Sequence, residues 1–173
     1  GRLTGAGPRG GRISSSALVN PAAAGGGALI CGPVDSGKTS LLKVLARRFL
    51  DAGFFPLYAD GKALHVSHPE ETSEFFLGKY SRQYAPEGYG LIRDETAEKR
   101  ILLLDNADRI RTGSSELGSF LLGLRDHFGA VILTAVNPPE FTDLPEGLSV
   151  FGVPEGYAVC GIAELGHALR EGL

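Results

Sequence analysis

The sequence predicts an α/β fold in three layers, α/β/α, with helices on both faces of a mostly parallel five-stranded sheet. Two observations predict it. From residue 28 onward, short apolar runs alternate with longer amphipathic segments, which is the pattern of a parallel sheet flanked by helices. The first of these runs leads through a glycine-rich loop into an amphipathic segment, so a strand is followed closely by a helix.

The individual elements follow from the spacing of apolar residues. In the first helix, Leu42, Leu45 and Phe49 recur on one face, and a proline followed by acidic residues suits the start of the second. The predicted helices are residues 38–52, 69–84, 114–127 and 163–171. The predicted strands are residues 28–31, 54–59, 100–105 and 130–136, with residues 148–151 and 157–162 as further candidates.

The chain divides into a lead-in and one domain. Residues 1–27 hold 8 of the 25 glycines and almost no bulky apolar residues, so we expect a flexible lead-in that cannot fold by itself. Residues 28–173 are expected to form the globular core. The chain has no methionine and begins at Gly1, which favours a fragment of a longer protein, cut in the helix after its last strand.

Composition and charge exclude several classes of protein. A net charge of −3 argues against a dedicated nucleic-acid binder, which usually carries a basic stripe, and we find no direct evidence for a nucleic-acid partner. No apolar run approaches the ~18 residues of a membrane span, and the N-terminus lacks the apolar stretch of a secretion signal. We therefore expect a cytoplasmic protein with no membrane partner.

The loop after the first strand matches the phosphate-binding pattern G-x-x-x-x-G-K-[ST], known as Walker A, in its proper place between a strand and a helix. Glycines let successive N–H groups point at phosphate oxygens, and the helix N-terminus adds partial positive charge. Lys38 is predicted to reach the β- and γ-phosphates, and the Thr39 hydroxyl to ligate the bridging Mg²⁺. The predicted nucleotide-binding residues are Gly32, Pro33, Val34, Asp35, Ser36, Gly37, Lys38, Thr39 and Ser40.

A second metal contact, the Walker B acid, is predicted at Asp105, which ends the apolar run at residues 101–104. Hydrolytic P-loop ATPases commonly carry a glutamate next, which polarises the attacking water, but here the next residue is Asn106. An amide cannot take a proton, so general-base catalysis is lost at that position, and Asp108 is the candidate substitute. The sequence therefore supports nucleotide binding more firmly than fast turnover.

Further candidates follow these two motifs. When a P-loop fold has an extra strand between the phosphate-loop strand and the acidic strand, a polar residue ending the extra strand lies near the γ-phosphate. Thr134 and Asn137 are candidates for that contact, and a plain loop asparagine before proline is the alternative. Arg109 and Arg111 are either charge-stabilising fingers on a neighbouring subunit or solvated side chains. The predicted catalytic residues are Lys38, Asp105, Asp108 and Asn137, and the predicted magnesium ligands are Thr39 and Asp105.

With these motifs in place, the chain resembles the additional-strand P-loop NTPases of the AAA+/STAND group, and more narrowly the ATPase modules of large bacterial multidomain proteins, some of them fused to metallophosphoesterases. The resemblance implies a domain that binds ATP with Mg²⁺ and switches between resting and active assemblies. Its implied partners are nucleotide, the other domains of the parent chain and further copies of itself. The similar stretches are residues 32–41, Gln83-Tyr84, residues 103–110 and residues 157–170.

We therefore expect a Mg-ATP-binding, slowly hydrolysing switch domain of a larger signalling or defence protein. Two alternatives stay open. A catalytically weak, nucleotide-dependent scaffold is favoured by Asn106. A P-loop small-molecule kinase would need an arginine-rich lid, and the loops after Gly61 and Pro138 contain no arginine cluster.

Overall fold

The computed structural model describes residues 2–5, 12–14, 27–65, 72–111, 114–136 and 157–162. Its strands are β1 (Arg2–Gly5), β2 (Arg12–Ser14), β3 (Gly27–Cys31), β4 (Phe55–Asp60), β5 (Arg100–Asp105), β6 (Ala130–Ala135) and β7 (Tyr157–Ile162). Its α-helices are α1 (Lys38–Asp51), α2 (Thr72–Gln83), α3 (Pro86–Asp94) and α4 (Ser114–His127). Three short 3-10 helices are η2 (Gly61–Ala63), η4 (Ala97–Lys99) and η5 (Ala107–Arg109).

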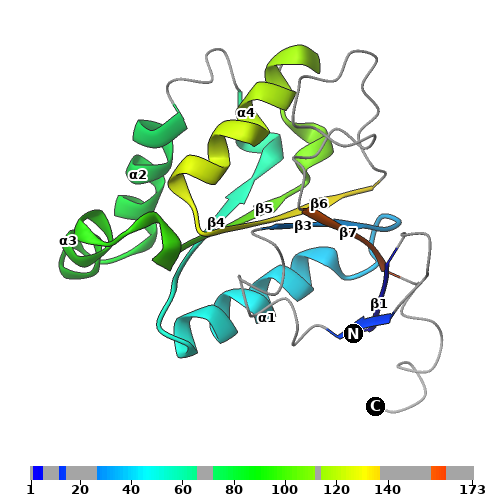
Figure 1. Cartoon of the computed structure of the whole chain (residues 1–173), viewed down its shortest axis with the longest axis horizontal. Helices are drawn as coiled ribbons and strands as arrows, with labels where there is room; N and C mark the ends of the chain where they lie inside the picture. The colour runs from blue at the N-terminus through cyan, green and yellow to red at the C-terminus, as the bar shows by residue number, and fades with distance from the viewer. Residues whose placement is uncertain are drawn as a thin grey trace.

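The strands form one mixed sheet in the order β2-β1-β7-β3-β6-β5-β4 (Figure 1). The strands from β7 to β4 run parallel to one another, whereas β1 runs antiparallel to both β7 and β2. Strand β6 lies between β3, which leads into the phosphate loop, and β5, which ends in Asp105. The extra strand considered in the sequence analysis is therefore present, and it brings the ends of β3, β6 and β5 to one edge of the sheet.

Within the described residues, the sheet has seven strands rather than the predicted five, because two strands form within the lead-in that we expected to be flexible. Leu3 of β1 pairs with Ile162 of β7 on one side and with Ile13 of β2 on the other. The lead-in lacks the apolar residues to fold by itself, but an open sheet edge satisfies its backbone N–H and C=O groups. The division of the chain at residue 28 stays a prediction.

Helices cover both faces of the sheet (Figure 1). Helix α1 packs on one face, where Leu42, Leu45 and Phe49 contact alternate residues of the central strands, such as Leu103 and Ile132. Successive residues of a strand point to opposite faces, so the remaining alternate residues face the other helices. The central strands are buried on both sides, which explains why they read as continuous apolar runs.

The opposite face is covered by α2, α3 and α4 (Figure 1). Phe76 of α2 packs against Phe120 and Phe128, with ring centroids 6.2 and 5.4 Å away. Leu29 and Leu104 of the central strands belong to the same buried cluster. This face holds the larger part of the described core.

Helix α3 was not predicted, because Gly88 and Gly90 weaken the helical pattern. Pro86 at the first helical position and Glu87 in the first turn suit a helix start. Ile92 is fully buried in the core cluster on this face, so its burial outweighs the weak helix propensity. The predicted strand at residues 148–151 and helix at residues 163–171 lie outside the described residues. None of the described helices is long and apolar enough to cross a bilayer.

Candidate functional site

The candidate site lies at the edge where β3, β6 and β5 end. The amide of Gly32 donates to the carbonyl of Ala135, 3.2 Å away, which ties the start of the phosphate loop to the end of β6. The loop then turns sharply, with positive φ values of 61° at Asp35 and 88° at Gly37. Gly37 directly precedes α1, and only glycine adopts this left-handed conformation without strain.

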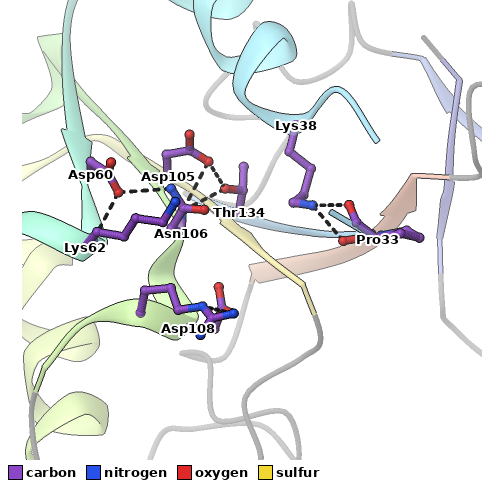
Figure 2. Close-up of polar contacts among 10 residues, drawn as sticks. Pro33, Lys38, Asp60, Lys62, Asp105, Asn106, Asp108 and Thr134 are labelled. Atoms are coloured by element: carbon purple, nitrogen blue, oxygen red, sulfur yellow. Dashed lines mark hydrogen bonds and ion pairs between the residues drawn. The ribbon is translucent and has the colours of Figure 1, made fainter. Parts of the chain in front are cut away.

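The Lys38 ammonium is folded over the phosphate loop (Figure 2). Its Nζ donates to the carbonyl oxygens of Gly32 at 2.7 Å and Pro33 at 2.6 Å, and it lies 3.4 Å from Ser36 Oγ. The side chain is buried, with only 8% of its residue surface exposed. These acceptors are neutral, and a charged phosphate oxygen is a stronger partner for an ammonium. The ammonium group of Lys38 is therefore held at the loop by acceptors that it can exchange for a phosphate oxygen.

Asp105 is the centre of a hydrogen-bond network. Its Oδ2 accepts from the Thr39 hydroxyl at 2.6 Å and from the Tyr58 hydroxyl at 2.9 Å. Its Oδ1 accepts from the Asn106 amide at 3.1 Å and from the Thr134 hydroxyl. Burial alone would raise the pKa of Asp105, but these hydrogen bonds outweigh it and lower the pKa below its ordinary value. The residue is therefore a carboxylate at neutral pH.

Two members of this network differ from what the sequence indicated. Tyr58 was not singled out at all, because its role depends on β4 lying beside β5. Burial, followed by its hydrogen bond to Asp105, raises the pKa of Tyr58, so its hydroxyl stays a donor. Thr134 was a candidate γ-phosphate contact, but its side chain is fully buried and its hydroxyl is directed at Asp105. Thr134 therefore supports the acidic residue.

The meeting of Thr39 and Asp105 fits a magnesium site. A hydroxyl and a carboxylate are the hard oxygen ligands that Mg²⁺ prefers, and these two lie within hydrogen-bonding distance although they are far apart in sequence. Within the described residues, no group of three or more His, Cys, Asp or Glu side chains gathers into a dedicated metal site. Two protein ligands suffice where phosphate oxygens and water complete the coordination of Mg²⁺.

A cavity of about 870 Å³ opens beside the phosphate loop. This volume lies within the range of small-molecule sites, about 300–1,000 Å³. Among the described residues, its wall carries four cationic side chains and one acidic side chain, so it favours an anionic ligand. The lining residues are Val34, Asp35, Gly37, Lys38, Thr39, Ser40, Lys62, Asn106, Arg109, Arg111 and Val136.

Three of these cations come from the segments that follow β4 and β5. The two segments run side by side, because the amide of Arg111 donates to the carbonyl of Leu64 at 3.2 Å. Their backbones also approach closely at Gly61, where a Cβ would lie 2.2 Å from the carbonyl oxygen of Asn106. This packing places Lys62, Arg109 and Arg111 along one cavity.

The sequence had offered the two arginines as fingers for a neighbouring subunit or as solvated side chains. In the structure, Arg109 and Arg111 line the cavity of their own chain. Lys62 was missed, since its only sequence signal is its place two residues after a strand end. Lys62, Arg109 and Arg111 lie near the phosphate loop because β4, β5 and β6 are neighbours in the sheet, and the sequence does not give this order of strands.

The remaining predicted residues fall in three groups. Six predicted nucleotide-binding residues, Val34, Asp35, Gly37, Lys38, Thr39 and Ser40, line the cavity. Gly32, Pro33 and Ser36 instead contact the Lys38 ammonium. Asp108 is not among the described residues that line the cavity, and its carboxylate lies 3.5 Å from Nε of Arg109 (Figure 2). Its role as a substitute base stays a prediction, and Asn137 lies outside the described residues.

No protein-family model matches the chain, and no curated protein sequence matches it. Among solved structures, the replication initiator DnaA bound to AMPPCP and single-stranded DNA is similar at a TM-score of 0.48 and 16% identity, over 84% of this chain and 43% of that chain. A DNA replication initiation factor is similar at a TM-score of 0.46 and 15% identity, over 84% of this chain and 43% of that chain. PCH-2 of C. elegans is similar at a TM-score of 0.36 and 22% identity, over 76% of this chain and 35% of that chain.

The chain therefore spans less than half the length of each of these solved chains. With TM-scores below 0.5, they add no argument about the site, and the assignment of the fold rests on the chain itself. A phosphate loop joins β3 to α1, a parallel strand separates β3 from β5, and β5 ends in an acid that reaches the loop threonine. Together these features are consistent with a P-loop NTPase fold.

Proposed function

We propose that this chain is a Mg-ATP-binding, slowly hydrolysing switch domain of the AAA+/STAND type, with a three-layer core. The observation that carries the proposal is the 2.6 Å contact between the Thr39 hydroxyl and the Asp105 carboxylate. Thr39 lines a cavity that also contains Lys38 and three further cations. This is the combination that a polyphosphate with its metal ion requires.

Binding follows from the contacts of each group. Lys38 leaves the carbonyls of Gly32 and Pro33 for the β- and γ-phosphates, which are charged and therefore stronger acceptors. Thr39 and Asp105 would hold Mg²⁺, which when bound neutralises charge on the phosphates. Backbone N–H groups of the loop and the N-terminus of α1 face the same anion.

The proposed biological setting rests on the resemblance of the motifs. We assign the domain to a larger cytoplasmic signalling or defence protein, in which its partners are the other domains of the parent chain and further copies of itself on activation. A catalytically weak scaffold is the second candidate, and it is favoured by Asn106, whose amide cannot act as a base. Single-turnover phosphate release separates the two, because a scaffold binds Mg-ATP without releasing phosphate.

The binding proposal is tested by Lys38→Ala. We expect this change to reduce Mg-ATP affinity by at least about ten- to a hundredfold, because it removes a charged hydrogen-bond donor from the phosphates. The matched control is Lys43→Ala, which removes an exposed lysine from the same helix and is expected to leave affinity unchanged. Calorimetric titration with Mg-ATP gives both affinities. An unchanged affinity in Lys38→Ala would sink the phosphate-loop assignment.

A further inference from the structure

Asn106 is held by a partner that the P-loop motifs do not include. It follows Asp105, lines the cavity, and has the left-handed backbone conformation, with φ 53°. Its side-chain Nδ2 donates to Oδ1 of Asp60 at 3.0 Å (Figure 2). Asp60 ends β4 and pairs in register with Asp105 on β5. Two acids and an amide therefore stand side by side at the edge of the sheet that carries the phosphate loop.

Asp60 determines which end of the Asn106 amide faces it. An ionised carboxylate only accepts hydrogen bonds, so the NH₂ group must face Asp60. The same Asp60 oxygen also accepts from the backbone amide of Lys62 at 3.0 Å, which fixes the carboxylate at the start of η2. Because the amide is planar, Oδ1 of Asn106 points away from Asp60 and is left as an acceptor.

Resting on the Mg-ATP hydrolysis assigned above, we propose that Asn106 Oδ1 accepts a hydrogen bond from the attacking water and that Asp60 is the positioning residue that orients it. An amide can orient a water for phosphoryl transfer without removing its proton. The water oxygen forms a bond to the γ-phosphorus, and the bond from that phosphorus to the bridging oxygen breaks, leaving its electron pair on ADP. The water's proton leaves on an oxygen of the released phosphate.

The same contact explains why an amide rather than an acid follows Asp105. A carboxylate at position 106 would stand at hydrogen-bonding distance from the Asp60 carboxylate, where two like charges repel. Asn106 forms a hydrogen bond there instead. An asparagine at position 106 therefore fits its neighbour Asp60 better than the acid that commonly occupies this position.

The test uses three variants and one control. Asp60→Ala removes the acceptor that orients the amide, and Asn106→Asp creates the repelling pair. We expect each to lower kcat by about ten- to a hundredfold, and we expect Mg-ATP affinity to stay unchanged in Asp60→Ala. The double variant Asp60→Asn/Asn106→Asp restores an amide-to-carboxylate hydrogen bond with the two groups exchanged, so it should recover most of the turnover lost in Asn106→Asp. Asp94→Asn, which changes an exposed acid on α3, is the control.

Steady-state phosphate release gives kcat, and calorimetry gives affinity. Unchanged kcat in Asp60→Ala, or a double variant no more active than Asn106→Asp, would overturn the role of Asp60. A wild-type chain that binds Mg-ATP without releasing phosphate would overturn this inference and leave the binding assignment standing. A chain that binds no Mg-ATP would instead refute the proposed function itself.

Discussion

Asp105 joins three segments of the chain through hydroxyl groups. Thr39 comes from α1, Tyr58 from β4 and Thr134 from β6, and all three contact the one carboxylate at the end of β5. Hydroxyl donors stabilise an anion without cancelling its charge. The carboxylate therefore keeps a full negative charge beside a cationic cavity, which is what a divalent cation arriving with a polyphosphate needs.

The lowered pKa of Asp105 predicts how the stability of the chain depends on pH. A carboxyl group with a depressed folded-state pKa stabilises the fold fully above its unfolded pKa, about 3.9, and this contribution is lost as pH falls through the folded-state value. Asp105→Asn should lower the free energy of unfolding at neutral pH by about 1.5–3 kcal/mol. The difference from wild type should narrow as the pH falls below about 4.

Urea unfolding at a series of pH values measures this effect. Asp51→Asn is the control, because Asp51 is exposed and pairs with Arg47 one turn away on the same helix. Exposed pairs of this kind contribute little, about 0.3–0.5 kcal/mol. A deficit in Asp105→Asn that stays constant down to the acid limit would show that the charge of the carboxylate is not what stabilises the fold.

At the scale of elements, β4 forms one end of the described sheet and so has an open backbone edge. The segment at the end of α2 covers it with side chains. Gln83 donates from Nε2 to the carbonyl of Pro56 at 2.9 Å and accepts from the amide of Tyr58 at 3.0 Å. The Tyr84 hydroxyl also donates to Pro56, at 2.7 Å. Gln83 thus supplies the donor and the acceptor that a neighbouring strand would supply.

Gln83→Ala should therefore weaken the edge of the sheet. Losing two hydrogen bonds predicts a decrease of about 1–3 kcal/mol in the free energy of unfolding. The exposed edge should also promote self-association, since open strand edges pair with other chains. Arg82→Ala is the matched control on the same turn of α2, with no expected change. Urea unfolding measures the stability, and light scattering measures the self-association. A Gln83→Ala chain as stable and as monodisperse as Arg82→Ala would show that Gln83 does not protect the edge of β4.

The elements that sequence could predict are those whose signal is local. The predicted bounds of strands β3, β5 and β6 agree with the structure to within one residue, because burial on both faces makes each a continuous apolar run. Helix α3 and the strands of the lead-in depend on distant partners, because Ile92 of α3 is buried in the core cluster and β1 pairs with β7. Neither partner is visible in a local pattern.

The candidate site divides in the same way. Lys38 and Thr39 belong to a contiguous motif, and Asp105 ends an apolar run, so each could be named from the sequence. Asp60 and Tyr58 could not, because each acts through a neighbour on an adjacent strand, at Asn106 and Asp105 respectively. The order of strands in the sheet determines which of these side chains contact one another, and a local sequence pattern does not reveal that order.

At the scale of the whole molecule, the net charge of the chain differs in sign from the charge on the described wall of the cavity. The chain carries a formal charge of −3, yet the described residues of the cavity wall include four cations and one acid. The parallel sheet produces this separation, because it brings the segments after β3, β4 and β5 to one edge. A polyphosphate is therefore attracted to one place on a protein that is acidic on average.

This arrangement predicts that Mg-ATP stabilises the whole fold. A ligand that binds only the folded state adds about 2.7 kcal/mol at a concentration 100 times Kd. For a domain of this size, each kcal/mol raises the melting temperature by about 2–4 °C, so we expect a rise of about 5–10 °C. Thermal melting with Mg-ATP, and with ATP plus a chelator, measures it. The rise should shrink when the chelator removes Mg²⁺, because Thr39 and Asp105 act through the metal. It should also shrink to about half or less in Lys38→Ala, and it should persist in full in Lys43→Ala. An equal rise in all of these conditions would place the ligand somewhere other than this cavity.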